Sequence, residues 1–304
     1  MNSNSLPAPL PPVIEETSAG RGYKLKEFIL FLRVHKLAAI GLSIIVILLI
    51  IAVIGPLISP YPDDAYKAVH LENKLLPPSW AHLFGTDELG RDLLTRTIYG
   101  TRLSFQIGIS VILLSILLGI PYGLISGYFG GWVDNVMMRV CEVFLSFPSM
   151  LLSISIVALL GPSLNNMMLS IALSWWPWFA RLMRSEAVAI KERGFVEAAK
   201  SMGVHPLVII FRHIWPNSLS VIIVQISMAF GSVILTAASL SFLGLGAQPP
   251  TPEWGLIIST GRAYFLTNWW YVTFPGVFIL LTVMAFNFLG DGLRDYLDPK
   301  TRNS

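Results

Sequence analysis

Long runs without a charged residue most strongly limit what this chain can fold into. Residues 37–58 form one such run, and no Asp, Glu, Lys or Arg occurs from His213 to Pro252. About 20 apolar residues in a helix cross the hydrocarbon core of a bilayer. Charged residues make up only 13% of the chain, whereas soluble domains contain about 25%. The sequence therefore predicts an integral membrane protein.

Six apolar runs divide the chain. A backbone inside lipid must satisfy its own hydrogen bonds, so each run is predicted to be a helix. Residues 37–304 are therefore expected to form one all-α membrane domain. The predicted spans cover residues 37–58, 103–128, 133–160, 166–185, 216–243 and 271–293.

The N-terminal 36 residues differ from the rest of the chain. Residues 1–20 are rich in Pro and Ser and lack periodicity, which predicts a disordered tail. In residues 21–36, Leu25, Phe28 and Leu32 lie at helical spacing. This segment is either an amphipathic helix in the membrane interface or an extension of the first span.

Lys and Arg residues gather in two places, before the first span and between the fourth and fifth spans. Basic residues near the ends of spans favour the cytoplasmic side. Both termini and the loop 190–216 are therefore predicted to be cytoplasmic. The basic residues are Arg21, Lys24, Lys26, Arg33 and Lys36 in the first group, and Arg181, Arg184, Lys191, Arg193, Lys200 and Arg212 in the second.

Several functional classes are excluded by what the sequence lacks. The net charge of +3 does not indicate a nucleic-acid partner. Cys141 is the single cysteine, so neither a disulfide framework nor a Cys-based zinc site can form. No phosphate-binding loop, H-E-x-x-H motif or Ser-His-Asp set is found. We therefore predict no catalytic residue, no metal site and no bound cofactor, with His205 and His213 as surface or helix-end residues.

Ionisable residues within the spans are few. A membrane enzyme would need several of them at one depth, and the clearest case is Arg139 with Glu142. These two lie at i and i+3 near the start of the third span. Because an isolated charge in the bilayer is costly, they are predicted to pair with each other or with Asp291 or Arg294.

A short charged segment, FVEAAKSMGVHP at 195–206, separates the fourth and fifth spans. Phe195, Ala198, Ala199 and Met202 recur at i, i+3, i+4 and i+7, which predicts a helix with a flat apolar strip. Gly203 is placed to cap it. The strip either fits a groove in a partner or packs on the chain's own membrane domain.

A second polar segment, HLFGTDELGRDLLTRTIYGTRLSFQIG at 82–108, leads into the second span. Its glycines supply turns around Asp87, Arg91 and Asp92, and these charges are expected to pair and hold the loop. The segment is either a surface that contacts a substrate-delivering protein or seals an outer gate, or a structural clamp for the span.

Polar and aromatic residues within the spans are candidates for lining a path. Pro177 interrupts the helix ladder in Ser174–Phe179, although packing is the default role of the tryptophans beside it. The candidates are Gln106, Trp175, Trp176, Gln225 and Asn287.

These segments resemble one known family. Glu197-Ala198-Ala199, Gly203 and the Ile214-Trp215-Pro216 ending resemble the EAA loop of ABC-importer permeases. Residues 82–108 resemble the hallmark of the C-type permease of dipeptide, oligopeptide and nickel transporters, and residues 241–255 and 286–300 look like the same family. The resemblance implies the type I ABC importer permease fold, with six transmembrane helices and a cytoplasmic coupling helix in the EAA loop 190–216.

The resemblance also implies roles for individual residues. One set would contact an ATPase, and a second would form an external loop motif. The ATPase-coupling residues are Phe195, Glu197, Ala198, Ala199, Lys200, Met202 and Gly203. The external loop residues are Gly85, Thr86, Asp87, Gly90, Arg91, Asp92 and Arg102.

The function implied is that of a non-catalytic permease subunit in the bacterial cytoplasmic (inner) membrane. It would form half of a translocation pore for di- or oligopeptides together with a homologous B-type permease. Two ABC ATPase subunits would hold ATP and magnesium, and an extracytoplasmic binding protein would deliver substrate. The alternatives are the same architecture importing nickel or another small chelate, and a membrane anchor without transport.

Overall fold

The computed structural model describes residues 31–297. The predicted tail 1–20 and most of the predicted helix 21–36 lie outside these residues. The chain divides into two units, residues 1–36 and 37–304, and the fold described below is that of the second unit. Its described part is helical, with no strand beyond a single bridge between Thr86 and Asp92.

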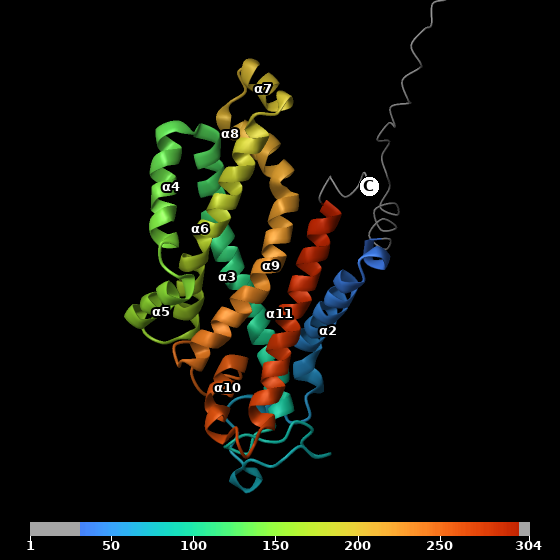
Figure 1. The fold of residues 1–304 in the computed structure, drawn as a ribbon. Coiled ribbons are helices and arrows are strands. Elements are labelled where there is room, and N and C mark those ends of the chain that lie inside the picture. Colours follow the sequence, from blue (N-terminus) through green and yellow to red (C-terminus); the bar gives the residue numbers. More distant parts are fainter. Residues whose placement is uncertain (1–30, 298–304) are drawn as a thin grey trace, which may run out of the picture. The chain divides into compact units, whose positions relative to one another are not determined.

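Ten α-helices follow one another in the described residues (Figure 1). Three 3₁₀ turns and one π-helical turn, Ile210–Ile214, accompany them. The helices are α2 (Lys36–Ile58), α3 (Leu93–Phe129), α4 (Gly131–Leu145), α5 (Ser149–Leu160), α6 (Leu164–Lys191), α7 (Gly194–Ser201), α8 (Pro206–Ile209), α9 (Trp215–Phe242), α10 (Trp254–Gly261) and α11 (Trp270–Leu297).

Four helical segments of the described residues are long and apolar enough to cross a membrane. They are α2, α3, α11, and α9 together with the turns before it, and a fifth span results if α4 and α5 count as one. Six were predicted. The prediction for 166–185 falls in α6, which has sufficient length but carries Asn166, Arg181 and Arg184. Because α6 packs against α3, α4, α5 and α9, it does not require a wholly apolar sequence.

The predicted third span, 133–160, is not one helix. α4 and α5 meet at 83°, and Ser146–Pro148 separates them. Pro148 has an extended ψ of 125° and no N–H to continue the ladder, and a residue that precedes proline disfavours helical geometry. The helix therefore breaks completely at Pro148, where one continuous span was predicted.

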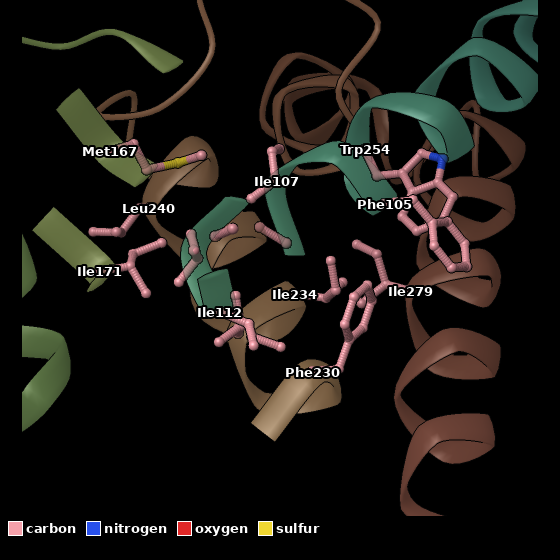
Figure 2. Packing of buried hydrophobic residues seen from close by; sticks show 14 of the residues in the cluster. Phe105, Ile107, Ile112, Met167, Ile171, Phe230, Ile234, Leu240, Trp254 and Ile279 are labelled. Atoms are coloured by element: carbon pink, nitrogen blue, oxygen red, sulfur yellow. The ribbon is translucent and has the colours of Figure 1, made fainter. Parts of the chain in front are cut away.

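Large apolar side chains from α3, α6, α9, α10 and α11 form the main core (Figure 2). The ring centroids of Phe105 in α3 and Phe230 in α9 lie 5.6 Å apart. Phe230 in turn stacks on Phe286 of α11 at 4.0 Å. Since lipid tails are as apolar as these side chains, close packing rather than exclusion from water holds such helices together.

Small residues set the closest helix approaches. Gly119, Gly123 and Gly127 lie four residues apart on α3 and face the backbone of α6. A Cβ atom on Gly123 would lie 2.2 Å from the carbonyl oxygen of Ala180. This spacing is the small-xxx-small pattern that lets membrane helices approach through their backbones.

Two ends of the second unit carry the polar segments noted in the sequence. α7 and α8 lie at one end, and the segment between α2 and α3 lies with α10 at the opposite end (Figure 1). The EAA segment and the 82–92 segment are thus separated by the full length of the long helices.

Candidate functional site

Helix α7 contains the EAA segment and presents two different faces. Val196 and Ala199 are buried and pack in a core cluster with α3, α6 and the start of α9. Phe195, Ala198 and Met202 are exposed, Met202 to 75%. The predicted flat strip therefore needs a correction, since Ala199 points inward and belongs to the chain's own core. Glu197, Lys200 and Gly203 are exposed beside the remaining strip.

Gly203 ends α7 in a left-handed conformation, with φ of +74°. The N–H of Val204 donates to the carbonyl of Ala199 at 3.1 Å, and the N–H of Gly203 donates to that of Lys200 at 2.9 Å. This pair of bonds is the Schellman motif. A Cβ at Gly203 would meet no atom within 4 Å, so backbone conformation rather than crowding favours glycine here.

Two lysines and one tyrosine connect α7 to α3 and α6. The Nζ atoms of Lys191 and Lys200 lie 5.8 and 5.5 Å from the ring centroid of Tyr128. Burial, followed by the nearby charge of Lys200, lowers the pKa of Lys191. The Lys200 contact joins α7 to α3, and the Lys191 contact joins the end of α6 to α3.

At the opposite end, buried charges form what we call the Asp/Arg cluster: Asp64, Asp87, Arg91, Asp92 and Arg96. Asp87 is fully buried, and its Oδ2 lies 2.6 Å from Nε of Arg91 and 3.5 Å from Nε of Arg96. Its Oδ1 accepts from the backbone N–H of Leu89 and of Arg91, both at 2.9 Å. The expected pairing of Asp87 with Arg91 is observed.

Asp92 caps the long helix α3. Its Oδ1 accepts from the N–H of Thr95 at 2.7 Å, and its own N–H donates to Oδ2 of Asp64 at 2.8 Å. The second oxygen lies 3.0 Å from Nδ1 of His82. Of the two roles considered for this segment, these contacts favour the structural clamp.

The Asp/Arg cluster also connects segments distant in sequence. Arg96 donates to the carbonyls of Ala65 and Pro250 at 3.2 and 3.4 Å. Beside Pro250, Glu253 is buried and accepts from two N–H groups at the start of α10. Burial raises the pKa of Glu253, and those two hydrogen bonds partly oppose the rise. The cluster therefore ties α3, α10 and the loops around them at one end of the unit.

The glycines and Thr86 of the loop motif are buried as well. Gly90 has φ of +79°, and a Cβ there would lie 1.8 Å from the carbonyl oxygen of His70. Thr86 accepts the N–H of Leu76 through its hydroxyl at 2.8 Å, and Gly85 packs against Trp270. Arg102 is the exception in this set, because it lies exposed on α3.

Two ion pairs lie along the spans. Arg139 pairs with Glu142 at 3.1 Å on an exposed face of α4, which is the mutual pairing expected from their spacing. A second pair was not predicted: Arg184 of α6 forms two bonds with Asp134 of α4, at 2.6 and 3.1 Å. Opposite charges at the same end of two apolar runs were the available signal, but 50 residues separate them.

The candidate path residues lie in different environments. Gln106 and Asn287 are exposed, whereas Gln225 and Trp175 are half-buried and Trp176 is buried. Trp176 packs edge-on against Tyr122 and Phe144, which is a packing role. The structure does not bring these five residues together at one site.

Comparison with known proteins identifies the family to which the chain is similar. Residues 119–303 match the family described as binding-protein-dependent transport system inner membrane component. Residues 25–78 match the N-terminal transmembrane domain of oligopeptide transport permease C.

Individual relatives cover most of the chain. A dipeptide transport system permease of Alkalihalophilus pseudofirmus is 47% identical over 90% of this chain and 88% of its own. A glutathione transport system permease of Pectobacterium atrosepticum is 44% identical, over 90% of both. A probable D,D-dipeptide transport system permease of Escherichia coli is 43% identical over 94% of this chain and 97% of its own.

One solved structure shares the fold. The methionine ABC transporter MetNI, in an inward-facing conformation, aligns with a TM-score of 0.54 at 17% identity. The alignment covers 67% of this chain and 97% of the MetNI chain. At this identity, the likeness concerns the arrangement of helices alone.

Proposed function

The chain belongs to the family of binding-protein-dependent transport system inner membrane components, and we propose that it is the permease subunit of an ATP-driven peptide importer. Members of this family are multi-pass membrane proteins that work with an ATPase and a substrate-binding protein. The relatives described above are named for dipeptide or glutathione transport, which supports a peptide cargo over a nickel chelate.

In this proposal, α7 is the coupling helix. The observation that carries it is the exposed strip of Phe195, Ala198 and Met202 at the end of the unit opposite the Asp/Arg cluster. A short helix with an apolar strip and charged flanks suits a groove in a partner protein. Ala199 and Val196 anchor its other face in the core, so force applied to the strip reaches α3, α6 and α9.

The proposed arrangement places α7 and both termini in the cytoplasm and the Asp/Arg cluster outside. A homologous B-type permease would supply the other half of the pore. ATP and magnesium would be bound by the ATPase subunits, and this chain would hold no cofactor of its own. Closure of the ATPases on ATP would move the two coupling helices and open the path outward.

Replacing Ala198 by Trp tests the coupling role. Ala198 is exposed, so the chain should fold and enter the membrane normally, while the large ring blocks the docking groove. We expect copurification of the ATPase subunits and uptake of alanyl-alanine to fall at least tenfold. Both are measured in cells that carry a tagged chain as the only copy.

The neighbouring change Ala199→Trp is the matched control. Ala199 is 3% exposed, so this variant should lose folded protein in the membrane, whereas Ala198→Trp should not. If Ala198→Trp keeps both its ATPase partners and normal uptake, α7 is not the coupling helix. If the wild-type chain takes up neither alanyl-alanine, a D,D-dipeptide nor glutathione while its ATPase partners copurify, the cargo is not a peptide of the kinds for which the relatives are named.

A further inference from the structure

A groove of about 490 Å³ lies between α2 and α3. Leu49, Ala52 and Val53 of α2 form its apolar wall, and Phe105 and Ile109 of α3 contribute to it. The three α2 residues lie in the uncharged run of that helix, about two turns before it ends. The groove is therefore at membrane depth, near the end of the unit that carries the Asp/Arg cluster.

Polar side chains of α3 form the rest of the groove. Arg102, Gln106 and Ser110 lie four residues apart, which places them on one face of the helix. The groove thus combines a polar stripe on α3 with an apolar wall on α2. Small-molecule sites of about 300–1,000 Å³ typically have this mixture of apolar walls and a few polar groups.

Arg102 is the unusual member of the stripe. Among the residues that the structure describes, no carboxylate lies within ion-pair distance of its guanidinium, and the guanidinium forms no hydrogen bond. Arg91 and Arg96 of the same motif are buried and paired with Asp87. A guanidinium at membrane depth is costly unless it meets an anion or water, so Arg102 is available for a ligand of opposite charge.

Peptide cargo carries such a group. A free peptide ends in an α-carboxylate, and the planar guanidinium matches a carboxylate through two parallel hydrogen bonds. Gln106 and Ser110, the next groups along the stripe, can bond to peptide N–H and C=O groups. A dipeptide or tripeptide fits within the groove volume.

We propose that Arg102, with Gln106 and Ser110, forms a binding site for the α-carboxylate end of a peptide in transit through the membrane. This inference rests on the proposed function and goes beyond it by naming a subsite of the path. Arg102 then helps to determine specificity for peptides with a free C-terminus, after the binding protein has released them.

The test uses the complete importer, with its second permease, ATPases and binding protein, reconstituted in liposomes. Uptake of alanyl-alanine is measured at saturating binding protein for the wild type, Arg102→Gln, Arg102→Lys and Arg139→Gln. We expect Arg102→Gln to reduce uptake at least tenfold and Arg102→Lys to retain an intermediate rate. Arg139→Gln, which removes an exposed arginine from an ion pair on α4, should remain within twofold of the wild type.

A photoreactive dipeptide, alanyl-photoleucine, locates the cargo during turnover. We expect labelling within residues 102–110 of the wild type and its loss in Arg102→Gln. Normal uptake by Arg102→Gln, or wild-type label confined to other segments, would overturn the proposal. Loss of the second permease from purified Arg102→Gln complexes would overturn it too, and would assign Arg102 to a subunit contact. Absence of uptake of any di- or tripeptide by the wild type would instead refute the proposed function, before any variant is compared.

Discussion

Asp87 is the residue of the Asp/Arg cluster whose carboxylate lies against both buried arginines. Its carboxylate pairs with Arg91 and Arg96 and accepts two backbone N–H groups, with no exposure to solvent. Removing one partner of a buried pair leaves the remaining charges uncompensated, which is costlier than losing the attraction alone. Replacing Asp87 is therefore expected to disrupt the whole Asp/Arg cluster.

Asp87→Ala should lower the free energy of unfolding by about 3–5 kcal/mol, because two buried guanidinium groups lose their anion. Thermal denaturation of the detergent-purified protein measures the effect. Glu72→Ala is the matched control, since it removes an exposed carboxylate of the same polar segment, 3.8 Å from His70, and exposed pairs contribute less than about 1 kcal/mol. Equal losses in the two variants would show that the cluster does not act as a clamp.

For single residues, the sequence correctly predicted the ion pairs whose partners are close along the chain. Asp87 with Arg91 and Arg139 with Glu142 are separated by four and three residues, and both pairs are observed. The pair Asp134 with Arg184 was missed, because only the packing of α4 on α6 brings it together. Helical spacing placed Ala199 on an apolar strip, but the spacing alone could not tell which half of the strip meets the core.

Among the helix–helix contacts of the described residues, the contact between α3 and α6 is the most extensive. Gly119, Gly123 and Gly127 let the two backbones meet without intervening side chains. Adding atoms to a close-packed contact forces the helices apart, at a typical cost of about 1–3 kcal/mol.

Gly123→Ala should therefore destabilise the protein by about 1–3 kcal/mol, although alanine is the better helix former. Gly276 of α11 provides the comparison, since a Cβ there would meet no atom within 4 Å. Gly276→Ala should be neutral or stabilise by up to about 1 kcal/mol through helix propensity alone. The melting temperature should thus fall for Gly123→Ala and stay unchanged or rise for Gly276→Ala. A rise for Gly123→Ala would contradict the backbone contact.

Helix positions were predictable where apolar runs were continuous, as in α2 and α9. The start of α3 was not: the predicted span begins at residue 103, ten residues after Leu93, because Arg96 and Arg102 interrupt the apolar run. Arg96 is compatible with the helix because the Asp/Arg cluster buries and neutralises it. The π-helical turn Ile210–Ile214 gave no signal in the sequence, since its residues fit an ordinary helix equally well.

For the whole molecule, hydropathy and the motif segments were enough to indicate a helical membrane permease, and the family match agrees with this. The number of spans was harder to predict. α6 lies on the predicted span 166–185 but carries polar and charged residues that depart from a continuous apolar run, and the break before Ser149 divides another predicted span. Both departures depend on which faces other helices cover, and a linear hydropathy pattern does not contain that information.

Labelling from one side of the membrane tests the proposed orientation. Cys141 is the single cysteine and is fully buried, so a Cys141→Ser background leaves no competing thiol. Trp80, 97% exposed in the segment before α3, and Ser201, exposed at the end of α7, are then each changed to Cys. A membrane-impermeant maleimide should label Trp80→Cys in intact cells stripped of any outer envelope, and Ser201→Cys only after permeabilisation. The reverse pattern would place α7 outside the cell, where no ATPase could reach it, and the coupling mechanism would have to be abandoned along with the orientation.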